Sequence, residues 1–397
     1  FAFYARQSYQ ITLNSENGVQ SMTASGTGVT RVGETNAYDI MYGAEVTISA
    51  TVKAGYNFGI DDADLVTWLQ SAVGSTVTLT DSYTPTSGKH TEISSTFTMT
   101  ATNRIDFTIS AHANTDTKYT IKYYFEKVDG SDYEQDLENY KDKVLSGTTD
   151  TNIDYSEQQI EINGFLFDHY GSTSTTDTTE GTSLNIDGDG SRVIKLYYDR
   201  RDDIKLTLTT DIQEAISDIY ITIGGVKQEG TSNVNVTYGT SVTVSVTVKN
   251  GYSFDGFTSS SSQVASVDKD GAVNSGTTYS YTFDMPYEDV TITANMLRNT
   301  NTSFNIVYMF ERLEVEGLTG SARYETLTAH PQTTGAGTTD ALITRELLAG
   351  QNKIIQEAGY VYASVGSMTS DGTLNPVYIS GEGNSTIYVY YTRDTYT

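Results

Sequence analysis

The chain is dominated by short segments in which apolar and polar residues alternate. The clearest are VTISATV at 46–52 and VTVSVTV at 242–248. Alternation with a period of two buries one set of side chains and leaves the other in solvent, as in a half-buried β-strand. Turn-forming sequences separate such segments, among them KAG at 53–55, KNG at 249–251 and DGDG at 187–190. We therefore predict a chain of small antiparallel sheets.

Two segments depart from this pattern and predict short helices. One is DADLVTWL at 62–69. The other is TDALITRELLAG at 339–350, where Thr339 or Asp340 would cap the helix and Gly350 would end it. The predicted fold class is therefore all-β with a little α-helix.

The alternating pattern is itself repeated along the chain. YGAEVTISATVKAGYNF at 42–58 returns as YGTSVTVSVTVKNGYSF at 238–254, a separation of 196 positions. TFTM at 96–99 likewise answers TFDM at 282–285. A fixed separation of this kind indicates a repeated structural unit, which we name module A.

A second unit, module B, lies between the copies of module A. YTIKYYFEKV at 119–128 corresponds to FNIVYMFERL at 304–313, and VIKLYYDR at 193–200 corresponds to TIYVYYTR at 386–393. Because the blocks recur in the same order at similar separations, they predict a second repeated unit with its own opening and closing strands.

The repeats predict the order A-B-A-B. FAFYAR at 1–6 is similar to the closing strand of module B, so residues 1–7 are interpreted as the last strand of a preceding module B. The junctions are short, which predicts a semi-rigid rod, and we expect the array to continue beyond both ends. The predicted modules are A1 at 8–116, B1 at 117–201, A2 at 202–300 and B2 at 301–397.

Composition and charge narrow the class of protein. Only 37% of residues are hydrophobic, which suits several small cores better than one large core. The formal net charge is −26, and such a field repels nucleic acids and anionic lipids. No stretch of about 20 apolar residues is present. We therefore expect no nucleic-acid partner and no membrane insertion.

Module A resembles the divergent internalin-B-type bacterial repeat. That pattern runs from Tyr-Gly through an alternating strand to Lys-x-Gly-Tyr-x-Phe, and closes with Phe-x-Met-Pro and Asp-Val-Thr. Module A1 departs from the closing part, and Phe257 of A2 stands where the family usually has Trp. The matching residues of A2 are Tyr238, Gly239, Lys249, Gly251, Tyr252, Phe254, Gly256, Phe257, Phe283, Met285, Pro286, Asp289, Val290 and Thr291.

Module B resembles the mucin-binding-protein (MucBP-like) repeat in its opening strand and its closing IKLYYDR strand. Both resemblances imply small β domains, β-grasp-like or Ig-like, on the extracellular surface of Gram-positive bacteria. They imply a cell-wall stalk or adhesin and transfer no active site. The sequence leaves the choice between the two module folds open.

No arrangement of residues in the sequence indicates catalysis. The chain has no cysteine, so a thiol nucleophile and the usual structural zinc cluster are excluded. No phosphate-binding loop or nucleophile elbow is present. The four histidines are scattered, at His90, His112, His169 and His330. We therefore expect that the protein is not an enzyme.

The turn Asn185-Ile-Asp187-Gly-Asp189-Gly is a candidate calcium site. Asp187 and Asp189 offer oxygen atoms at alternate positions, as calcium loops do. The turn lacks EF-hand spacing and a closing Glu. The alternative, which the sequence favours, is that Asp and Gly only form a hairpin turn. No other cofactor is expected.

Lys122 and Asp199 are a candidate isopeptide cross-link, because they lie on the first and last strands of B1. The equivalent residues of B2 are Val307 and Thr392, so the pair is not repeated. The alternative is two solvated charges, which are common on protein surfaces.

Tyrosines crowd the end strands of module B. Consecutive strand residues face opposite sides, so one member of each aromatic pair would face outward and bind sugars or a neighbouring copy. The favoured alternative is cross-strand packing. The candidate surface residues are Tyr123, Tyr197, Tyr388 and Tyr390.

Three functions remain open. The first, which we favour, is a structural stalk or fibre segment of a secreted surface protein, within an adhesin. The second is an adhesin arm that binds host glycan or protein. The third is a self-assembling filament or surface-layer subunit, in which an unpaired strand at 1–7 completes the sheet of a neighbouring copy. The expected partners are neighbouring modules, copies of the same protein, or a host glycan or protein.

Overall fold

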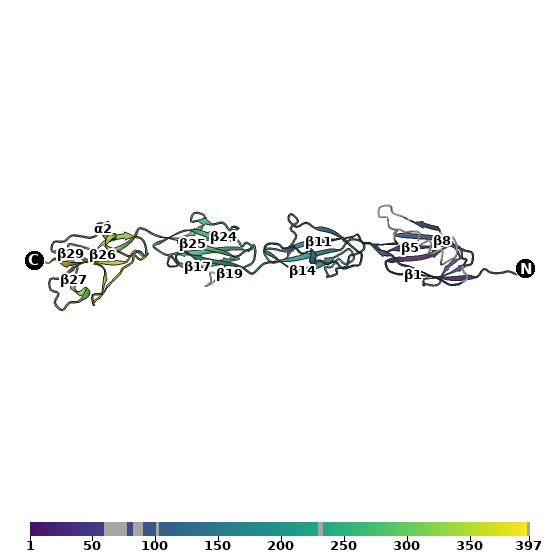
Figure 1. The fold of residues 1–397 in the computed structure, drawn as a ribbon, viewed down its shortest axis with the longest axis horizontal. Coiled ribbons are helices and arrows are strands. Elements are labelled where there is room, and N and C mark those ends of the chain that lie inside the picture. Colours follow the sequence, from purple (N-terminus) through teal and green to yellow (C-terminus); the bar gives the residue numbers. More distant parts are fainter. Residues whose placement is uncertain (59–77, 82–89, 101–102, 229–232, 395–397) are drawn as a thin grey trace. The chain divides into compact units, whose positions relative to one another are not determined.

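The computed structural model describes residues 1–58, 78–81, 90–100, 103–228 and 233–394 (Figure 1). Strands account for 51% of the structure and helices for 4%, which confirms the all-β prediction. The chain divides into two compact units, Phe1–Asp199 and Arg200–Thr397. The helix predicted at 62–69 lies outside the described residues.

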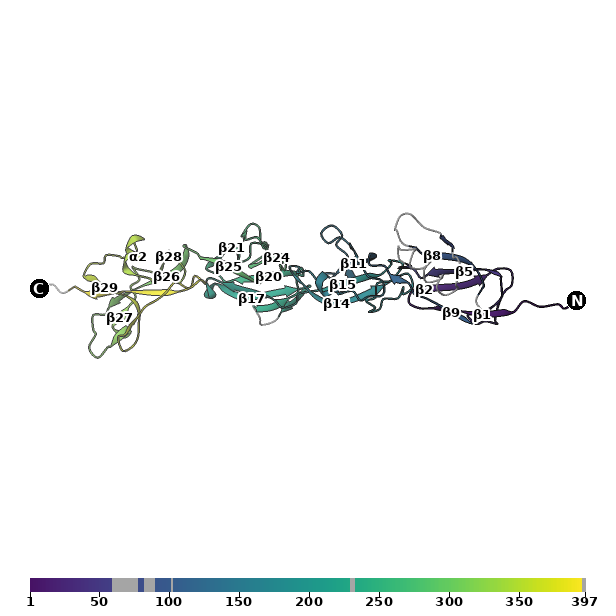
Figure 2. The ribbon, with the colours of Figure 1, turned by 45° about the vertical axis from the view of Figure 1, so that its right-hand side comes forward.

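Module A is a sandwich of two sheets in both units. In A2 the two sheets have the strand orders β19-β16-β25-β21-β22 and β18-β17-β20-β24-β23. Figure 2 labels β21 and β25 of the first sheet and β17, β20 and β24 of the second. The A2 strands are β16 Ile204–Thr210, β17 Ile216–Ile223, β18 Val226–Gln228, β19 Asn233–Val236, β20 Ser241–Val248, β21 Tyr252–Ser259, β22 Val267–Asp268, β23 Val273–Ser275, β24 Thr278–Asp284 and β25 Val290–Arg298.

Module A1 repeats this arrangement in shorter strands. Its described sheets have the orders β3-β4-β1-β9 and β2-β5-β8-β7, and β6 pairs with β10. The A1 strands are β1 Ser8–Ser15, β2 Val19–Ser25, β3 Val29–Arg31, β4 Ala37–Met41, β5 Glu45–Val52, β6 Tyr56–Asn57, β7 Thr78–Asp81, β8 Glu92–Thr98, β9 Ile105–Ile109 and β10 His112–Ala113.

The core of module A comes from the period-two pattern. In β20 the side chains of Val242, Val244 and Val246 are buried and pack with residues of the opposite sheet, among them Leu206 and Phe254. In A1 the equivalent residues Val46 and Ile48 of β5 are buried in the same way. The alternation read from the sequence therefore identifies the faces that the two sheets bury against each other.

Module B is built on a single main sheet with irregular segments packed against it. In B1 the order is β12-β11-β15-β14, with β13 also paired to β11; in B2 it is β27-β26-β31-β29-β30, with β28 paired to β26. The elements of B1 are β11 Thr117–Glu126, β12 Tyr133–Glu134, β13 Lys143–Gly147, η1 Ser156–Gln158, β14 Phe165–Thr173 and β15 Val193–Arg200. Those of B2 are β26 Thr302–Glu311, η3 Gly320–Arg323, β27 Tyr324–Glu325, β28 Thr333–Gly337, α2 Arg345–Gly350, β29 Tyr360–Met368, β30 Leu374–Asn375 and β31 Thr386–Arg393.

Among the described strand pairs whose direction is given, each module contains one parallel pair, which the antiparallel prediction did not include. The pairs join an early strand to the last long strand of the module, as β11 joins β15 in B1 and β26 joins β31 in B2. In module A the corresponding pairs are β1 with β9 and β16 with β25. The remaining pairings given for the described strands are antiparallel.

One local prediction needs correction. Helix α2 begins at Arg345, and its N-cap is Thr344, whose hydroxyl accepts a hydrogen bond from the Leu347 amide at 3.2 Å. Asp340 cannot start the helix because its φ of 66° belongs to a left-handed turn. Residues 1–7 form no strand in this structure and are exposed. A closing strand of module B pairs with the opening strand of the same module, so the assignment of these residues to a preceding module B stays a prediction.

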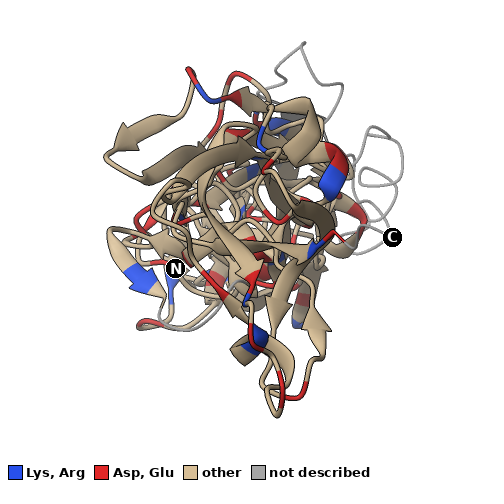
Figure 3. Cartoon of the chain, turned by 90° about the vertical axis from the view of Figure 1, so that its left-hand side faces the viewer, with Lys and Arg blue, Asp and Glu red and all other residues tan. Residues whose placement is uncertain are grey.

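The sequence has 50 acidic and 24 basic residues, which give the net charge of −26. Figure 3 marks the acidic and basic positions of the described residues on the ribbon. None of the described helices is long and apolar enough to cross a membrane.

Candidate functional site

The tyrosines expected on the surface of module B are mostly core residues. Tyr123 is 1% exposed and Tyr390 is 2% exposed. The Tyr123 hydroxyl donates to the carbonyl oxygen of Gln158 at 3.0 Å, and the Tyr390 hydroxyl accepts from the Met368 amide at 3.1 Å. The segment around Gln158 packs over Tyr123, whereas Tyr390 contacts Tyr324 of β27 and Met368 at the end of β29. Neither buried ring offers a surface for sugar stacking.

Tyr197 lies at the centre of a polar aromatic cluster on the other face of the B1 sheet. Its ring stacks on His169, with centroids 4.5 Å apart, and meets Tyr133 edge to face at 4.9 Å. Its hydroxyl donates to the Glu180 carboxylate at 2.8 Å, and Lys195 Nζ lies 2.5 Å from the same carboxylate. Burial, followed by the hydrogen bond to Glu180, raises the pKa of Tyr197.

Tyr197, Glu180 and Lys195 are joined by hydrogen bonds within this cluster. Tyr197 is 9% exposed because His169 covers one side of its ring. Glu180 accepts from both Lys195 and Tyr197, and these two bonds help to hold its pKa below the usual value, although burial acts in the opposite direction. The geometry is that of a packed sheet face stabilised by a charged hydrogen-bond network.

Tyr388 is the member of the predicted set that stays partly exposed. It lies on β31, with its ring centroid 6.4 Å from that of Tyr390. A ligand-binding role for Tyr388 stays a prediction.

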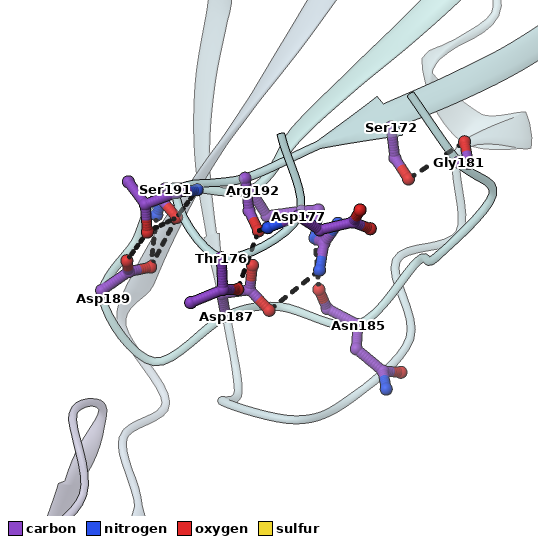
Figure 4. Close-up of polar contacts among 11 residues, drawn as sticks. Ser172, Thr176, Asp177, Gly181, Asn185, Asp187, Asp189, Ser191 and Arg192 are labelled. Carbon is purple, nitrogen blue, oxygen red and sulfur yellow. Dashed lines mark hydrogen bonds and ion pairs between the residues drawn. The ribbon is translucent and has the colours of Figure 1, made fainter. Parts of the chain in front are cut away.

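The Asp187 turn is organised by a buried arginine (Figure 4). Arg192 is 4% exposed, and its Nη2 donates to Asp187 Oδ1 at 2.9 Å. Its Nε donates to the carbonyl oxygen of Asn185 at 3.0 Å, and its Nη1 lies 3.7 Å from Asp177 Oδ2. The guanidinium therefore places a positive charge within the turn that is the candidate calcium site.

Asp189 is held by neighbours in the same turn. Its Oδ1 accepts from the amide of Ser191 at 3.0 Å and from the Ser191 hydroxyl at 2.6 Å. Its Oδ2 accepts from the Thr175 hydroxyl. These hydrogen bonds, that from the Ser191 side chain first, lower the pKa of Asp189. The pattern is a local turn motif in which the carboxylate caps backbone and hydroxyl donors.

The carboxylates of this turn provide fewer oxygen ligands than a calcium ion requires. Within the described ranges, no group of three or more His, Asp or Glu residues is placed to hold a metal ion. Calcium binding by Asp187 and Asp189 stays a prediction, and both carboxylates have other partners in the chain.

Lys122 and Asp199 are not brought together. The parallel register pairs Lys122 with Lys195, so Asp199 lies four residues further along β15, about 13 Å away at the usual rise per strand residue. Lys122 Nζ lies 3.0 Å from Asp142 Oδ2, and Asp199 Oδ1 accepts from the Tyr133 hydroxyl at 2.5 Å. An isopeptide bond requires direct contact, so the predicted cross-link is not formed.

Two residues of these clusters were not predicted from the sequence. Arg192 follows the acidic turn directly, and a basic residue at that position was an available signal for an internal counter-ion. Glu180 lies in an irregular segment without periodicity, and nothing in the local sequence indicates that it reaches Tyr197 and Lys195.

The comparison with protein families bears on module A2. Residues 221–300 match the divergent InlB B-repeat domain. The resemblance predicted for A2 is confirmed. The match covers less than half of the chain, and the likeness of module B to mucin-binding repeats stays a prediction. No curated protein sequence matches the chain.

Several solved structures of bacterial surface proteins are similar at a low level. The pilus adhesin SpaC from Lactobacillus rhamnosus GG is 9% identical over 89% of this chain and 57% of its own, with a TM-score of 0.27. An adhesin from Mobiluncus mulieris is 11% identical over 73% of this chain and 98% of its own, with a TM-score of 0.17. A streptococcal ancillary pilin is 9% identical over 73% and 99%, with a TM-score of 0.15. The chain thus spans little more than half of SpaC, and scores this low carry no conclusion about function.

Proposed function

We propose that the chain is a structural stalk or fibre segment of a bacterial cell-surface adhesin, located outside the cell. The observation that carries this proposal is that the same pair of modules is built twice. In a repeat protein each unit contacts chiefly its neighbours, so every added unit makes the array longer. Repetition of one architecture is therefore typical of extended surface proteins.

The repetition extends to single hydrogen bonds in the cores of B1 and B2. Tyr198 and its counterpart Tyr391 each accept a backbone amide hydrogen, from Ile160 at 3.0 Å and from Ile355 at 2.9 Å. Each hydroxyl anchors an irregular segment over its sheet. The aromatic residues of module B are thus engaged in holding the module together, which favours a spacer over a ligand-binding arm.

The charge distribution supports a role in a crowded array. A net charge of −26 keeps neighbouring copies apart in solution and disfavours collapse onto anionic surfaces. Proteins that polymerise through their faces generally lower such repulsion at the contact. The charge therefore favours a soluble spacer over a self-assembling filament.

The proposal can be tested on the intact chain in solution. We expect sedimentation velocity to give a monomer at all accessible concentrations, and a glycan array to retain none of the chain. Concentration-dependent polymers would favour the filament, and retention that is lost in Tyr388→Ala would favour a binding arm.

A deletion tests the spacer role directly. Arg6 and Arg200 end similar sequences, FAFYAR and VIKLYYDR, so removing residues 7–200 joins Arg6 to Arg201 and deletes one A–B pair. We expect solution scattering to show a folded protein whose maximum dimension falls by about half. An unchanged maximum dimension would contradict a role as a spacer.

A further inference from the structure

Within each unit, three separate turns meet where module A is followed by module B. One is the Lys-x-Gly-Tyr turn of module A, and the other two belong to module B. We name this contact the A–B joint. In the first unit it consists of Gly55, Tyr56, Thr149, Asp150 and Gly188, and in the second unit of Gly251, Tyr252, Thr339, Asp340 and Gly381.

A buried threonine lies at the centre of the joint. In the first unit Thr149 is 2% exposed, and its hydroxyl donates to the carbonyl oxygen of Gly55 at 2.8 Å. A carbonyl oxygen only accepts, so the neighbouring Thr117 hydroxyl, 2.7 Å away, must donate to Thr149. A backbone carbonyl of module A and two hydroxyls of module B therefore satisfy one another away from water.

The second unit repeats these bonds atom for atom. Thr339 is 0% exposed, and its hydroxyl donates to the carbonyl oxygen of Gly251 at 2.7 Å. The Thr302 hydroxyl, the counterpart of Thr117, lies 2.7 Å from that of Thr339.

A tyrosine of module A binds an aspartate of module B beside each threonine. The hydroxyl of Tyr56 donates to Asp150 Oδ2 at 2.5 Å, and that of Tyr252 donates to Asp340 Oδ2 at 2.5 Å. Both aspartates have left-handed backbones, with φ of 62° and 66°. Outside glycine this conformation is uncommon and is tolerated best by Asn and Asp. The two units therefore use the same unusual turn to direct the aspartate carboxylate toward the tyrosine hydroxyl.

Facing glycines allow the two backbones to touch. A Cβ on Gly55 would lie 2.4 Å from the Cα of Gly188, and a Cβ on Gly251 would lie 2.2 Å from the Cα of Gly381. No side chain fits at these distances, which accounts for glycine on both sides of the contact in both units.

The chain that connects the modules also belongs to the joint. The amide of Asn114 donates to Gly55 O at 2.7 Å, and its carbonyl oxygen accepts from the Thr149 amide at 2.9 Å. Asn299 makes both bonds in the second unit, to Gly251 and from Thr339, each at 2.9 Å. The connecting residue is therefore fixed to both modules rather than acting as a free linker.

We infer that the Lys-x-Gly-Tyr turn of module A is a docking surface for the module B that follows it in the same chain, and that the A–B pair is the rigid unit of the array. In both units, three turns from distant parts of the sequence bring the same polar atoms to equivalent partners. Chance contacts between modules would not repeat in this way. The short, bonded connection at Asn114 and Asn299 gives the following module a high effective concentration at this surface, which favours it over a second chain. The inference stands whether or not the array serves as a spacer.

The absence of cysteine from the sequence allows a clean test on the full chain. Spin labels at Asp284→Cys on β24 and Ala363→Cys on β29, both exposed, report the distance between A2 and B2 by pulsed electron paramagnetic resonance. We expect one narrow distance distribution. A broad distribution in the otherwise unchanged chain would overturn the inference.

Gly381→Ala should open the joint. A Cβ there would lie 2.1 Å from the Asn250 carbonyl oxygen, and the φ of Gly381 is not left-handed, so the substitution strains the contact rather than its own backbone. The matched control is Gly350→Ala in the same module, where a Cβ meets nothing within 4 Å. We expect the distribution to widen at least twofold in the first variant and to stay unchanged in the control. Equal widths in all three proteins would overturn the inference.

A second variant approaches the joint from module A and leaves module B unaltered. Tyr252→Phe removes only the hydroxyl that binds Asp340, with Tyr378→Phe, whose ring is 57% exposed, as its control. We expect calorimetry to resolve separate transitions for A2 and B2 in Tyr252→Phe and Gly381→Ala, and one shared transition in the unchanged chain and the controls. Unfolding profiles of Tyr252→Phe and Tyr378→Phe that coincide would count against docking through this turn.

Discussion

Arg192 and Asp187 form a charge pair in the last turn before β15, with Nη2 and Oδ1 2.9 Å apart. The arginine side chain is almost fully buried, whereas that of Asp187 is partly exposed. Within the described chain, Arg192 Nη1 and Asp187 Oδ2 have no hydrogen-bond partner. The pair therefore depends on a single good hydrogen bond between its two members and on the Asn185 carbonyl oxygen.

Replacing the buried arginine should destabilise module B1. Arg192→Met leaves Asp187 without its counter-ion, and breaking a buried pair costs about 3–5 kcal/mol when both charges are fully buried. Because Asp187 is partly solvated, we expect a loss of about 2 kcal/mol in the free energy of unfolding, measured by chemical denaturation.

The control for this substitution is Arg104→Met. Arg104 and Asp106 form a pair whose side chains are 59% and 55% exposed, and exposed pairs contribute about 0–1 kcal/mol. Equal losses in the two variants would show that burial of Arg192 adds nothing to the stability of the turn.

Calcium should have little effect on the stability of B1. Asp187 is bound by Arg192, and Asp189 accepts from Ser191 and Thr175, so an ion would have to displace these donors. We expect millimolar calcium chloride to leave the thermal midpoint unchanged relative to the same concentration of magnesium chloride. A calcium-specific rise that disappears in Asp189→Asn would instead establish the calcium site that the sequence suggests.

The alternating segments predict strands well because alternation has a direct physical cause. Val242, Val244 and Val246 point to one face and are buried, as period two requires. Alternation does not reveal which strand becomes the neighbour, so the parallel pairing of β11 with β15 was not predicted. That pairing depends on contacts between residues about 70 positions apart in the sequence.

The candidate sites were harder to predict than the strands. Period two indicates that Tyr123 and Tyr124 face opposite sides, but it does not say that an irregular segment covers Tyr123 at Gln158. Such segments carry no periodic signal. The joint residues Gly55 and Gly251 were predicted only as turn formers, because the close approach of a second module leaves no trace in the local pattern.

Removing the hydroxyl of Tyr198 should destabilise B1, and removing that of Tyr391 should destabilise B2 to the same extent. Each hydroxyl accepts a hydrogen bond from a backbone amide, that of Ile160 or Ile355. The substitution to Phe leaves this donor unsatisfied, which costs about 1–3 kcal/mol where the donor is buried. We expect Tyr198→Phe and Tyr391→Phe each to lower the free energy of unfolding by about 1–2 kcal/mol.

Chemical denaturation measures both losses, and Tyr4→Phe is the control because its ring is 93% exposed. If the losses in the free energy of unfolding of the two core variants differed from each other as much as from that of the control, these two hydrogen bonds would not be equivalent in B1 and B2.

Alkaline pH should weaken the joint of the second unit. Burial, followed by the hydrogen bond to Asp340, raises the pKa of Tyr252 to about 12 from its ordinary value of 10.0. The protonated hydroxyl is the form that the joint stabilises. Its contribution is therefore fully present below pH 10, where the unfolded chain also keeps the proton, and is lost progressively as the pH rises to about 12.

Burial raises the pKa values of other tyrosines as well, among them Tyr198 and Tyr391, so the measurement is a difference between two proteins. We expect the stability of the unchanged chain to exceed that of Tyr252→Phe by a constant amount up to about pH 10, and the gap to narrow between about pH 10 and 12. Denaturation with guanidinium at a series of pH values gives both curves. A stability difference that stays constant across this range would mean that the pKa of Tyr252 is the same in the folded and unfolded chains. The bond between Tyr252 and Asp340 would then not hold the modules together.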